Sequence, residues 1–225
     1  MNQQPPEKQN LQSPGVLQVH SIFRTIQGEG PFTGQRAVFI RLAGCNLQCP
    51  LCDTDYTDKR KELSVMTIMD HVIAIGNPGI LVVITGGEPF RQNLSWLVEA
   101  LLADGYRVQI ETNGTLYQDL PFDKITVVCS PKTGSVNKKL QPHIHSLKYV
   151  LRAGYIMADG LPISALDHSA SPILARPWPE FRGTVYVQPV DIPGSDNAHL
   201  DATIASVMRN GYTLCLQTHK IIGLE

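Results

Sequence analysis

Residues 41–54, which read RLAGCNLQCPLCDT, form the stretch around which this chain is organised. Three of its five cysteines, Cys45, Cys49 and Cys52, lie here with the spacing C-x3-C-x2-C. The loop is too short for an unstrained disulfide, and an odd number of cysteines cannot all pair. Thiolates crowded in this way suit a soft metal ion or an iron–sulfur cluster.

A structural zinc site is the main alternative for these thiolates. Zinc in such a site takes four protein ligands, and the nearest further candidates, His20 and His71, lie in separate segments. A 4Fe-4S cluster held by three cysteines instead leaves one iron open to a non-protein ligand. We therefore favour a 4Fe-4S cluster on the three cysteines. Cys129 and Cys215 lie in apolar runs and are interpreted as small buried hydrophobic residues.

Length and composition indicate one domain with a sizeable core, since the chain has 225 residues and 43% of them are hydrophobic. Residues 1–16 are polar and contain proline, so we expect a flexible N-terminal tail before a core domain at 17–225. The net charge is −1 without a sustained basic run, which favours a small-molecule partner over nucleic acid. The sequence shows neither a secretory start nor a membrane-spanning apolar run, and we expect a soluble, cytoplasmic protein.

Strand-like and helix-like segments alternate along the chain, which predicts an α/β fold with a parallel sheet and outer helices. We expect strands at 17–24, 37–42, 80–84, 107–111, 125–129, 147–151, 184–187 and 213–217. Helices are expected from Thr67 to about 75, at 94–103 and near 200–208, with Thr67 as the cap of the first. The four prolines of residues 158–182 predict a segment that is mostly loop.

Polar residues follow the predicted strands, and ligands bind parallel sheets at the carboxyl ends of their strands. These residues are Cys45, Thr85, Glu111, Ser130, Gln188 and His219, each at or just after the end of a strand. A single strand end would not indicate a site, but their agreement predicts one common mouth.

Several motifs now resemble a known family. The cysteine spacing, with Gly86-Gly87-Glu88-Pro89 after the strand at 80–84, resembles the radical S-adenosylmethionine (SAM) superfamily. Within it the chain is similar to the 7-carboxy-7-deazaguanine synthases through TIQGEG at 25–30, FIRL at 39–42, CDT at 52–54, ETNGT at 111–115, SPK at 130–132 and QTHK at 217–220. The resemblance implies an abridged, partial TIM-type (β/α) barrel.

The resemblance also implies an activity. SAM would chelate the open iron, and its reductive cleavage would yield methionine and a 5′-deoxyadenosyl radical. That radical would remove hydrogen from carbon 6 of 6-carboxy-5,6,7,8-tetrahydropterin. The ring would then contract with loss of ammonia, which gives 7-carboxy-7-deazaguanine for 7-cyano-7-deazaguanine and queuosine synthesis. The implied partners are a flavodoxin- or ferredoxin-type electron donor and a second copy of the chain in a homodimer, with neither nucleic acid nor membrane.

Site residues follow from the same resemblance. SAM-binding positions are Leu51, Cys52, Asp53, Gly87, Ser130, Pro131, Lys132, Gln188, Pro189, Val190 and Asp191. Substrate-binding positions are Ile26, Gln27, Gly28, Glu29, Arg41, Thr85, Glu111, His219 and the chain-terminal Glu225. Thr54 matches the position that binds Mg²⁺, which prefers oxygen ligands.

Three of these residues receive a more specific expectation. The pterin carries a carboxylate and a guanidine-like edge, so its pocket needs a cation and an anion or carbonyl. We expect Arg41 to pair with the carboxylate and Glu29 to bind the amino-pyrimidinone edge. Glu88 is expected mainly to hold its own loop.

Two rival functions remain open from the residues. A radical SAM activase, which installs a glycyl radical in another protein, would use the same cysteines but leave Arg41, Thr54 and residues 217–220 without a task. A non-catalytic binding module stabilised by zinc or an iron–sulfur cluster is the second rival. Metal analysis and anaerobic iron reconstitution separate that module from an enzyme.

Overall fold

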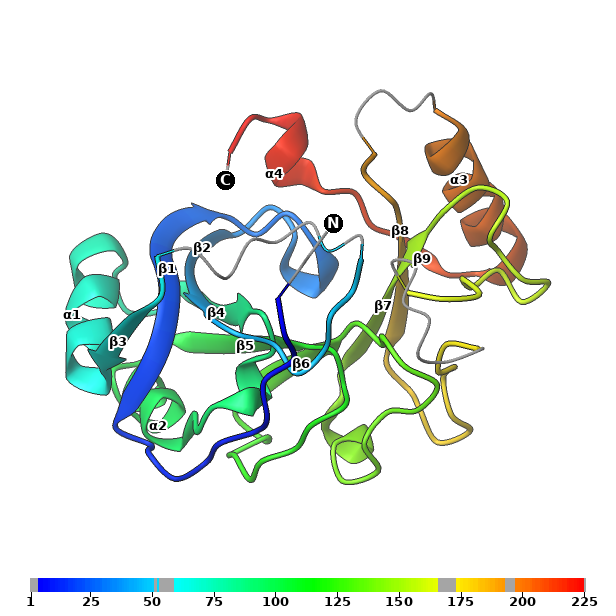
Figure 1. Cartoon of the computed structure of the whole chain (residues 1–225). Coiled ribbons are helices and arrows are strands. Elements are labelled where there is room, and N and C mark those ends of the chain that lie inside the picture. The colour runs from blue at the N-terminus through cyan, green and yellow to red at the C-terminus, as the bar shows by residue number, and fades with distance from the viewer. Residues whose placement is uncertain (1–3, 51, 53–58, 166–172, 193–196, 225) are drawn as a thin grey trace.

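The computed structural model describes residues 4–50, 52, 59–165, 173–192 and 197–224. The strands form one sheet in the order β3-β1-β2-β4-β5-β6-β7-β8-β9 (Figure 1). They are β1 (Val16–Ile26), β2 (Arg36–Leu42), β3 (Lys61–Ser64), β4 (Leu81–Gly86), β5 (Arg107–Thr112), β6 (Ile125–Cys129), β7 (Ser146–Leu151), β8 (Thr184–Pro189) and β9 (Thr213–Leu214).

The sheet is mostly parallel and open. β1 pairs antiparallel with β2 and β3, whereas every pairing from β2 through β9 is parallel. β3 and β9 are its opposite edges, so the strands do not close into a full barrel. The predicted α/β class and the partial barrel are therefore confirmed.

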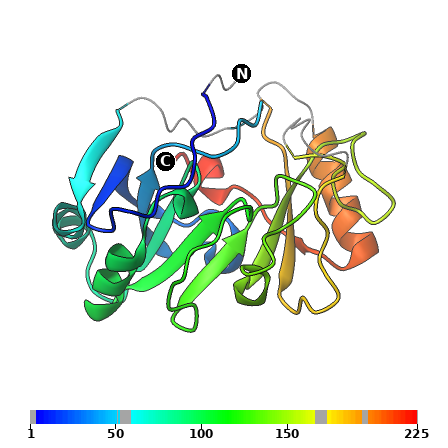
Figure 2. The same cartoon turned by 60° about the horizontal axis from the view of Figure 1, so that its bottom comes forward.

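Helices lie at both ends of this sheet. They are α1 (Val65–Ile75), α2 (Ser95–Ala103), α3 (Ala198–Asn210) and the short α4 (Thr218–Ile221). α1 and α2 contact each other and pack against β1 and β5, and α3 packs against β8. Figures 1 and 2 show α1 and α2 at one end of the sheet and α3 at the other. Within the described residues, each helix is too short or too polar to cross a membrane.

Some predicted boundaries differ from the observed ones. The first helix begins at Val65, and Ser64 caps it by accepting a hydrogen bond from the Thr67 backbone N–H, so Thr67 as the cap was wrong. β3 was missed because its sequence, KELS, is short and polar for an edge strand. The last strand is also shorter than predicted. The described parts of 158–182 contain no helix, in keeping with their prolines.

Side-chain alternation along the strands separates the core from the opposite face of the sheet. On β2, Val38, Ile40 and Leu42 are fully buried in the main core, which also includes side chains of α1 and α2. Successive side chains of a strand point to opposite faces, so Phe39 and Arg41 point away from that core. The face opposite the helices therefore receives Arg41, beside a small apolar cluster that includes Phe39 and Val83.

The described part of the predicted tail contacts the domain. The Glu7 backbone N–H donates to the Cys45 carbonyl at 2.8 Å, and Asn10 forms a parallel bridge with Gln92. The Gln9 side chain donates to the Phe90 carbonyl at 2.8 Å. The flexible tail at 1–16 and the core domain at 17–225 stay predictions. Any motion of residues 7–10 away from the domain must break these hydrogen bonds.

Candidate active site

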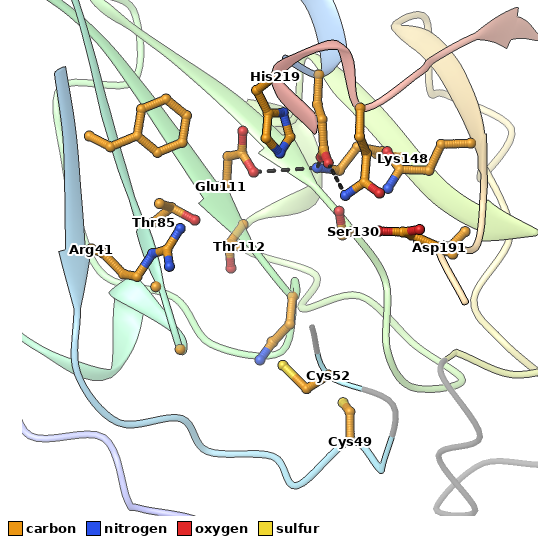
Figure 3. A pocket seen from close by; sticks show the side chains of 18 of the residues that line it. Arg41, Cys49, Cys52, Thr85, Glu111, Thr112, Ser130, Lys148, Asp191 and His219 are labelled. Carbon is orange, nitrogen blue, oxygen red and sulfur yellow. Dashed lines mark hydrogen bonds and ion pairs between the residues drawn. The ribbon is translucent and has the colours of Figure 1, made fainter. Parts of the chain in front are cut away.

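A cavity of about 270 Å³ opens on the face of the sheet opposite the helices (Figure 3). Predicted site residues that line it are Ile26, Gln27, Glu29, Arg41, Cys45, Cys49, Cys52, Thr85, Gly87, Glu111, Ser130, Lys132, Gln188, Pro189, Val190, Asp191 and His219. Gly28 and Pro131 are not part of its lining. Leu51, Asp53, Thr54 and Glu225 lie outside the described residues.

Strand register explains why these residues meet. Arg41 on β2 is directly opposite Thr85 on β4. Ile84 pairs with Ile110, so Thr85 and Glu111 are the next neighbours across β4 and β5. Parallel strands in register place equivalent side chains on one face, and a shift by one residue would turn each of them into the core.

The cysteine loop follows β2 and provides a donor set that suits a 4Fe-4S cluster. Burial raises the pKa of Cys45 to about 12, and the neighbouring Cys49 and Cys52 act in the same direction. Three adjacent thiolates are therefore unfavourable without a positive centre, which iron would provide. Among the described residues, the three cysteine side chains are not close enough together to hold one metal ion. Cys52 itself lies between residues that are not described.

Glycines allow the cysteine loop to lie directly on the loop after β4. A Cβ atom on Gly87 would overlap the carbonyl of Gly44, the residue before Cys45. The Glu88 backbone N–H donates to that same carbonyl at 3.0 Å. Close packing of the two loops thus requires glycine at position 87. This steric requirement is separate from the expected role of Gly87 near SAM.

The Glu88 side chain is fully buried and does not line the cavity. Its carboxylate accepts hydrogen bonds from the Phe90 N–H at 3.0 Å, the Thr112 hydroxyl at 2.7 Å and the Asn113 N–H at 2.7 Å. Burial raises the pKa of Glu88 to about 7 despite these three donors. These contacts agree with the expectation that Glu88 holds the loop.

The loop after β5 also supports the cysteine loop. The Asn113 side-chain amide donates to the Asn46 side chain at 2.9 Å, and Asn46 donates to the Thr115 hydroxyl at 2.8 Å. The Asn113 amide also lies 4.0 Å from the Cys45 sulfur. Sequence reasoning noted residues 111–115 as a motif but gave neither Asn46 nor Asn113 a task.

Arg41 presents a cation to the cavity. Its guanidinium lies 5.4 Å from the centre of the Phe23 ring, a cation–π contact. Its Nε is buried and has no hydrogen-bond partner among the described residues. A buried donor without a partner costs free energy unless a ligand satisfies it, so this geometry suits an anionic group such as a carboxylate.

A cluster of charged residues lines the side of the cavity opposite Cys49 and Cys52 (Figure 3). Lys148 on β7 forms ion pairs with Glu29 and, at 3.4 Å, with Glu111. Gln217 donates to Glu29 at 2.8 Å, and Glu111 accepts from Gln27 at 3.0 Å and Gln109 at 2.9 Å. We call Glu29, Glu111 and Lys148 the carboxylate–lysine cluster.

Electrostatics within this cluster favour the charged forms. Burial alone would raise the pKa of Glu29, but the Lys148 charge and hydrogen bonds from Lys148 and Gln217 lower it to about 2. Burial alone would lower the pKa of Lys148, but Glu111 and Glu29 raise it above the ordinary lysine value. The cluster is thus a cation between two carboxylates.

Lys148 and Gln217 are cavity residues that sequence reasoning missed. Lys148 lies within the apolar run 147–151, and a lysine inside a predicted buried strand was the signal that could have identified it. Gln217 belongs to the QTHK motif but was assigned no role.

The C-terminal segment closes one side of the cavity. Any side chain at Gly28 would overlap the imidazole of His219, and the Thr218 N–H donates to the Gly28 carbonyl at 3.2 Å. Lys220 pairs with Asp191 at 2.8 Å, which ties this segment to the end of β8. Residues 218–219 thus cover Gly28, which lies about 190 positions earlier in the sequence. This packing explains why Gly28 contacts His219 and does not line the cavity.

The chain matches the Radical SAM superfamily over residues 39–126. It is 45% identical to 7-carboxy-7-deazaguanine synthase of Rhodospirillum rubrum over 92% of both chains. It is 37% identical to the enzyme of that name from Rickettsia prowazekii over 98% of this chain and 94% of the relative. The crystal structure of QueE from Escherichia coli shares the fold, with a TM-score of 0.67, 24% identity and coverage of 89% of this chain and 93% of that one. The chain therefore belongs to the 7-carboxy-7-deazaguanine synthase family of radical SAM enzymes.

Proposed function

We propose that this chain converts 6-carboxy-5,6,7,8-tetrahydropterin to 7-carboxy-7-deazaguanine with release of ammonia, as its relatives' name implies. The observation that carries this proposal is one cavity lined by three loop cysteines, by Arg41 and by the carboxylates of Glu29 and Glu111. The reaction would serve 7-cyano-7-deazaguanine and queuosine synthesis.

Cys45, Cys49 and Cys52 would hold the 4Fe-4S cluster, and the cavity beside them would hold SAM. When bound, the cluster and SAM would supply a 5′-deoxyadenosyl radical for hydrogen-atom removal from the substrate. Gly87 leaves room beside the cysteine loop, and Ser130, Lys132 and the segment from Gln188 to Asp191 line the cavity where a nucleoside would bind.

The substrate would lie between Arg41 and the carboxylate–lysine cluster. The Arg41 Nε, which has no partner in the described part of the chain, supports a hydrogen bond to the pterin carboxylate. Glu29 and Glu111 supply acceptors for the N–H donors of the amino-pyrimidinone edge. Opposite ends of the ligand then meet opposite charges, which fixes the position of carbon 6.

The remaining expectations belong to this proposal. Thr54 would supply an oxygen ligand to Mg²⁺, and the Glu225 carboxylate would contact the substrate. A flavodoxin- or ferredoxin-type protein would reduce the cluster, and the chain would act as a homodimer in the cytoplasm. Family membership supports each of these assignments. It does not favour the activase or the binding module.

The test is anaerobic incubation of the reconstituted protein with dithionite, SAM and the carboxytetrahydropterin, followed by mass spectrometry. We expect 7-carboxy-7-deazaguanine, methionine and 5′-deoxyadenosine. SAM cleavage without a deazaguanine product would contradict the proposed substrate. Stoichiometric zinc without cluster absorbance would favour the binding module.

A further inference from the structure

Lys148 is a charged residue of the cavity that the proposed function leaves without a task. It is only 7% exposed and lies in the middle of β7. Its ammonium group contacts Glu29, which follows β1, and Glu111, which belongs to β5. Three segments distant in sequence thus meet at one ammonium group.

The two carboxylates need this cation to remain charged together. They have side-chain exposures of 13% and 17%, so water screens their repulsion poorly. When two carboxylates share a buried site without a cation, one of them takes up a proton at a raised pKa. A protonated carboxyl donates a hydrogen bond where a carboxylate accepts one.

We infer that Lys148 is a positioning residue that determines specificity by keeping Glu29 and Glu111 as paired hydrogen-bond acceptors. The cavity then selects a nitrogen heterocycle whose edge is made of N–H donors, as in a guanidine-like group, and disfavours an edge that presents acceptors. This inference rests on the proposed function, because it assumes that the substrate edge meets these carboxylates.

The glutamines around the cluster support this assignment. Gln27 and Gln109 both donate to one oxygen of Glu111, and Gln217 donates to the oxygen of Glu29 that does not face Lys148. Each carboxylate is therefore oriented by neutral donors while Lys148 bridges the remaining oxygens. Two ionised carboxylates accept all of these hydrogen bonds, whereas a protonated carboxyl would bring a further O–H donor into a site that already holds three amide donors and an ammonium group.

Other titratable groups face the cluster from neighbouring elements. His219 on α4 interacts with Glu29, and Cys215 after β9 interacts with Lys148. Tyr186 on β8 lies directly opposite Lys148 in the sheet register. These groups are present in the native protein and in all variants compared below, so the native profile serves as the reference for any pH dependence that they cause.

The experiment measures the Kd of the carboxytetrahydropterin anaerobically for the reconstituted holoenzyme with SAM, between about pH 6 and about pH 9. We expect Lys148→Met to introduce a new pH dependence. Its Kd should rise roughly tenfold per pH unit below the apparent pKa of the carboxylate pair, because binding then requires loss of a proton. The unmodified protein should lack this rise.

A double variant separates this role from a structural one. Lys148→Met combined with Glu111→Gln has one carboxylate and no lysine, so it carries the same net charge as the native cluster. We expect the new pH dependence to move to lower pH, because the remaining carboxylate no longer has a like-charged neighbour, although affinity falls. A structural role for Lys148 predicts instead that the double variant binds at least as poorly as Lys148→Met at every pH, with an unchanged profile.

Two controls complete the design. Lys124→Met removes an exposed lysine outside the cavity and should keep the native profile. If Lys148→Met does not fold, Lys148→Gln takes its place with the same expectation. A flat profile in the lysine variant would overturn the inference while native turnover kept the proposed function intact. Failure of the native holoenzyme to bind the pterin would instead overturn the proposed function.

Discussion

The Glu7 carboxylate forms an ion pair with Arg91 at 2.9 Å, and the Glu7 backbone N–H donates to the carbonyl of Cys45. Arg91 in turn donates to the Ala43 carbonyl at 2.9 Å, and its side chain is only 6% exposed. Glu7, in the predicted tail, thus stabilises the start of the cysteine loop through its contacts with Arg91 and the Cys45 carbonyl.

Glu7→Ala should destabilise the protein by about 1–3 kcal/mol, because it leaves a buried guanidinium without its carboxylate. Denaturant unfolding of the apoprotein measures this change, and iron content after reconstitution should fall with it. Lys8→Ala alters an exposed neighbour and serves as the matched control. Equal unfolding free energies for the two variants would show that the ion pair contributes nothing.

Cys49→Ala should give a folded protein that no longer cleaves SAM, because two cysteines would remain for a cluster that needs three. The measurements are circular dichroism and anaerobic production of 5′-deoxyadenosine. Cys129→Ala, in the buried β6, should lose about 1 kcal/mol of stability and still cleave SAM. Retained cleavage in the Cys49 variant would refute the cluster assignment.

Arg41→Ala should weaken pterin binding by at least about tenfold, as expected for the loss of a charge-assisted hydrogen bond. Cleavage of SAM without substrate should change much less. Arg41→Lys keeps the charge but loses the planar guanidinium, so its affinity for the pterin should lie between those of the native protein and Arg41→Ala. The comparison is KM for the pterin against the uncoupled cleavage rate, and equal losses would place Arg41 in the scaffold.

Glu88 should make stability depend on pH. Its pKa is raised to about 7 in the folded protein, mainly by burial, from an ordinary value of 4.5. The folded state therefore holds a proton that the unfolded state releases, so stability falls as pH rises between these values, by up to about 3 kcal/mol. Unfolding of the apoprotein at several pH values measures the slope.

Glu88→Gln is the control for this slope, because an amide does not titrate in that range. It should flatten the pH dependence and cost about 1 kcal/mol at every pH, since its NH₂ group must face one of the three donors around Glu88. A variant that kept the native slope would assign the titration to another group.

Magnesium removal should slow turnover without affecting the cysteine cluster. Thr54→Ala should have the same effect and should respond less to added Mg²⁺, because it lacks the proposed oxygen ligand. Rates measured with and without chelator over a Mg²⁺ titration test both statements. Full activity in chelator would remove the basis for assigning Thr54.

The cysteine loop, every strand except the short edge strand β3, and the polar residues at the strand ends could be read from the sequence. These features are local, because ligand spacing, an apolar run and a glycine-rich turn are each contained in a few neighbouring residues. Cys45, Thr85 and Glu111 could be brought together from sequence because parallel strands share one carboxyl edge, whereas Arg41 was assigned through the family resemblance.

The pairing of charges across that edge could not be read from the sequence. Lys148 meets Glu29 and Glu111 through strand order and register, which depend on contacts between β1, β5 and β7. Glu7 reaches Arg91 and Cys45 by the same kind of long-range packing. A local sequence pattern cannot show such pairs. The attraction between the charges becomes strong only when distant segments pack together and exclude water from around them.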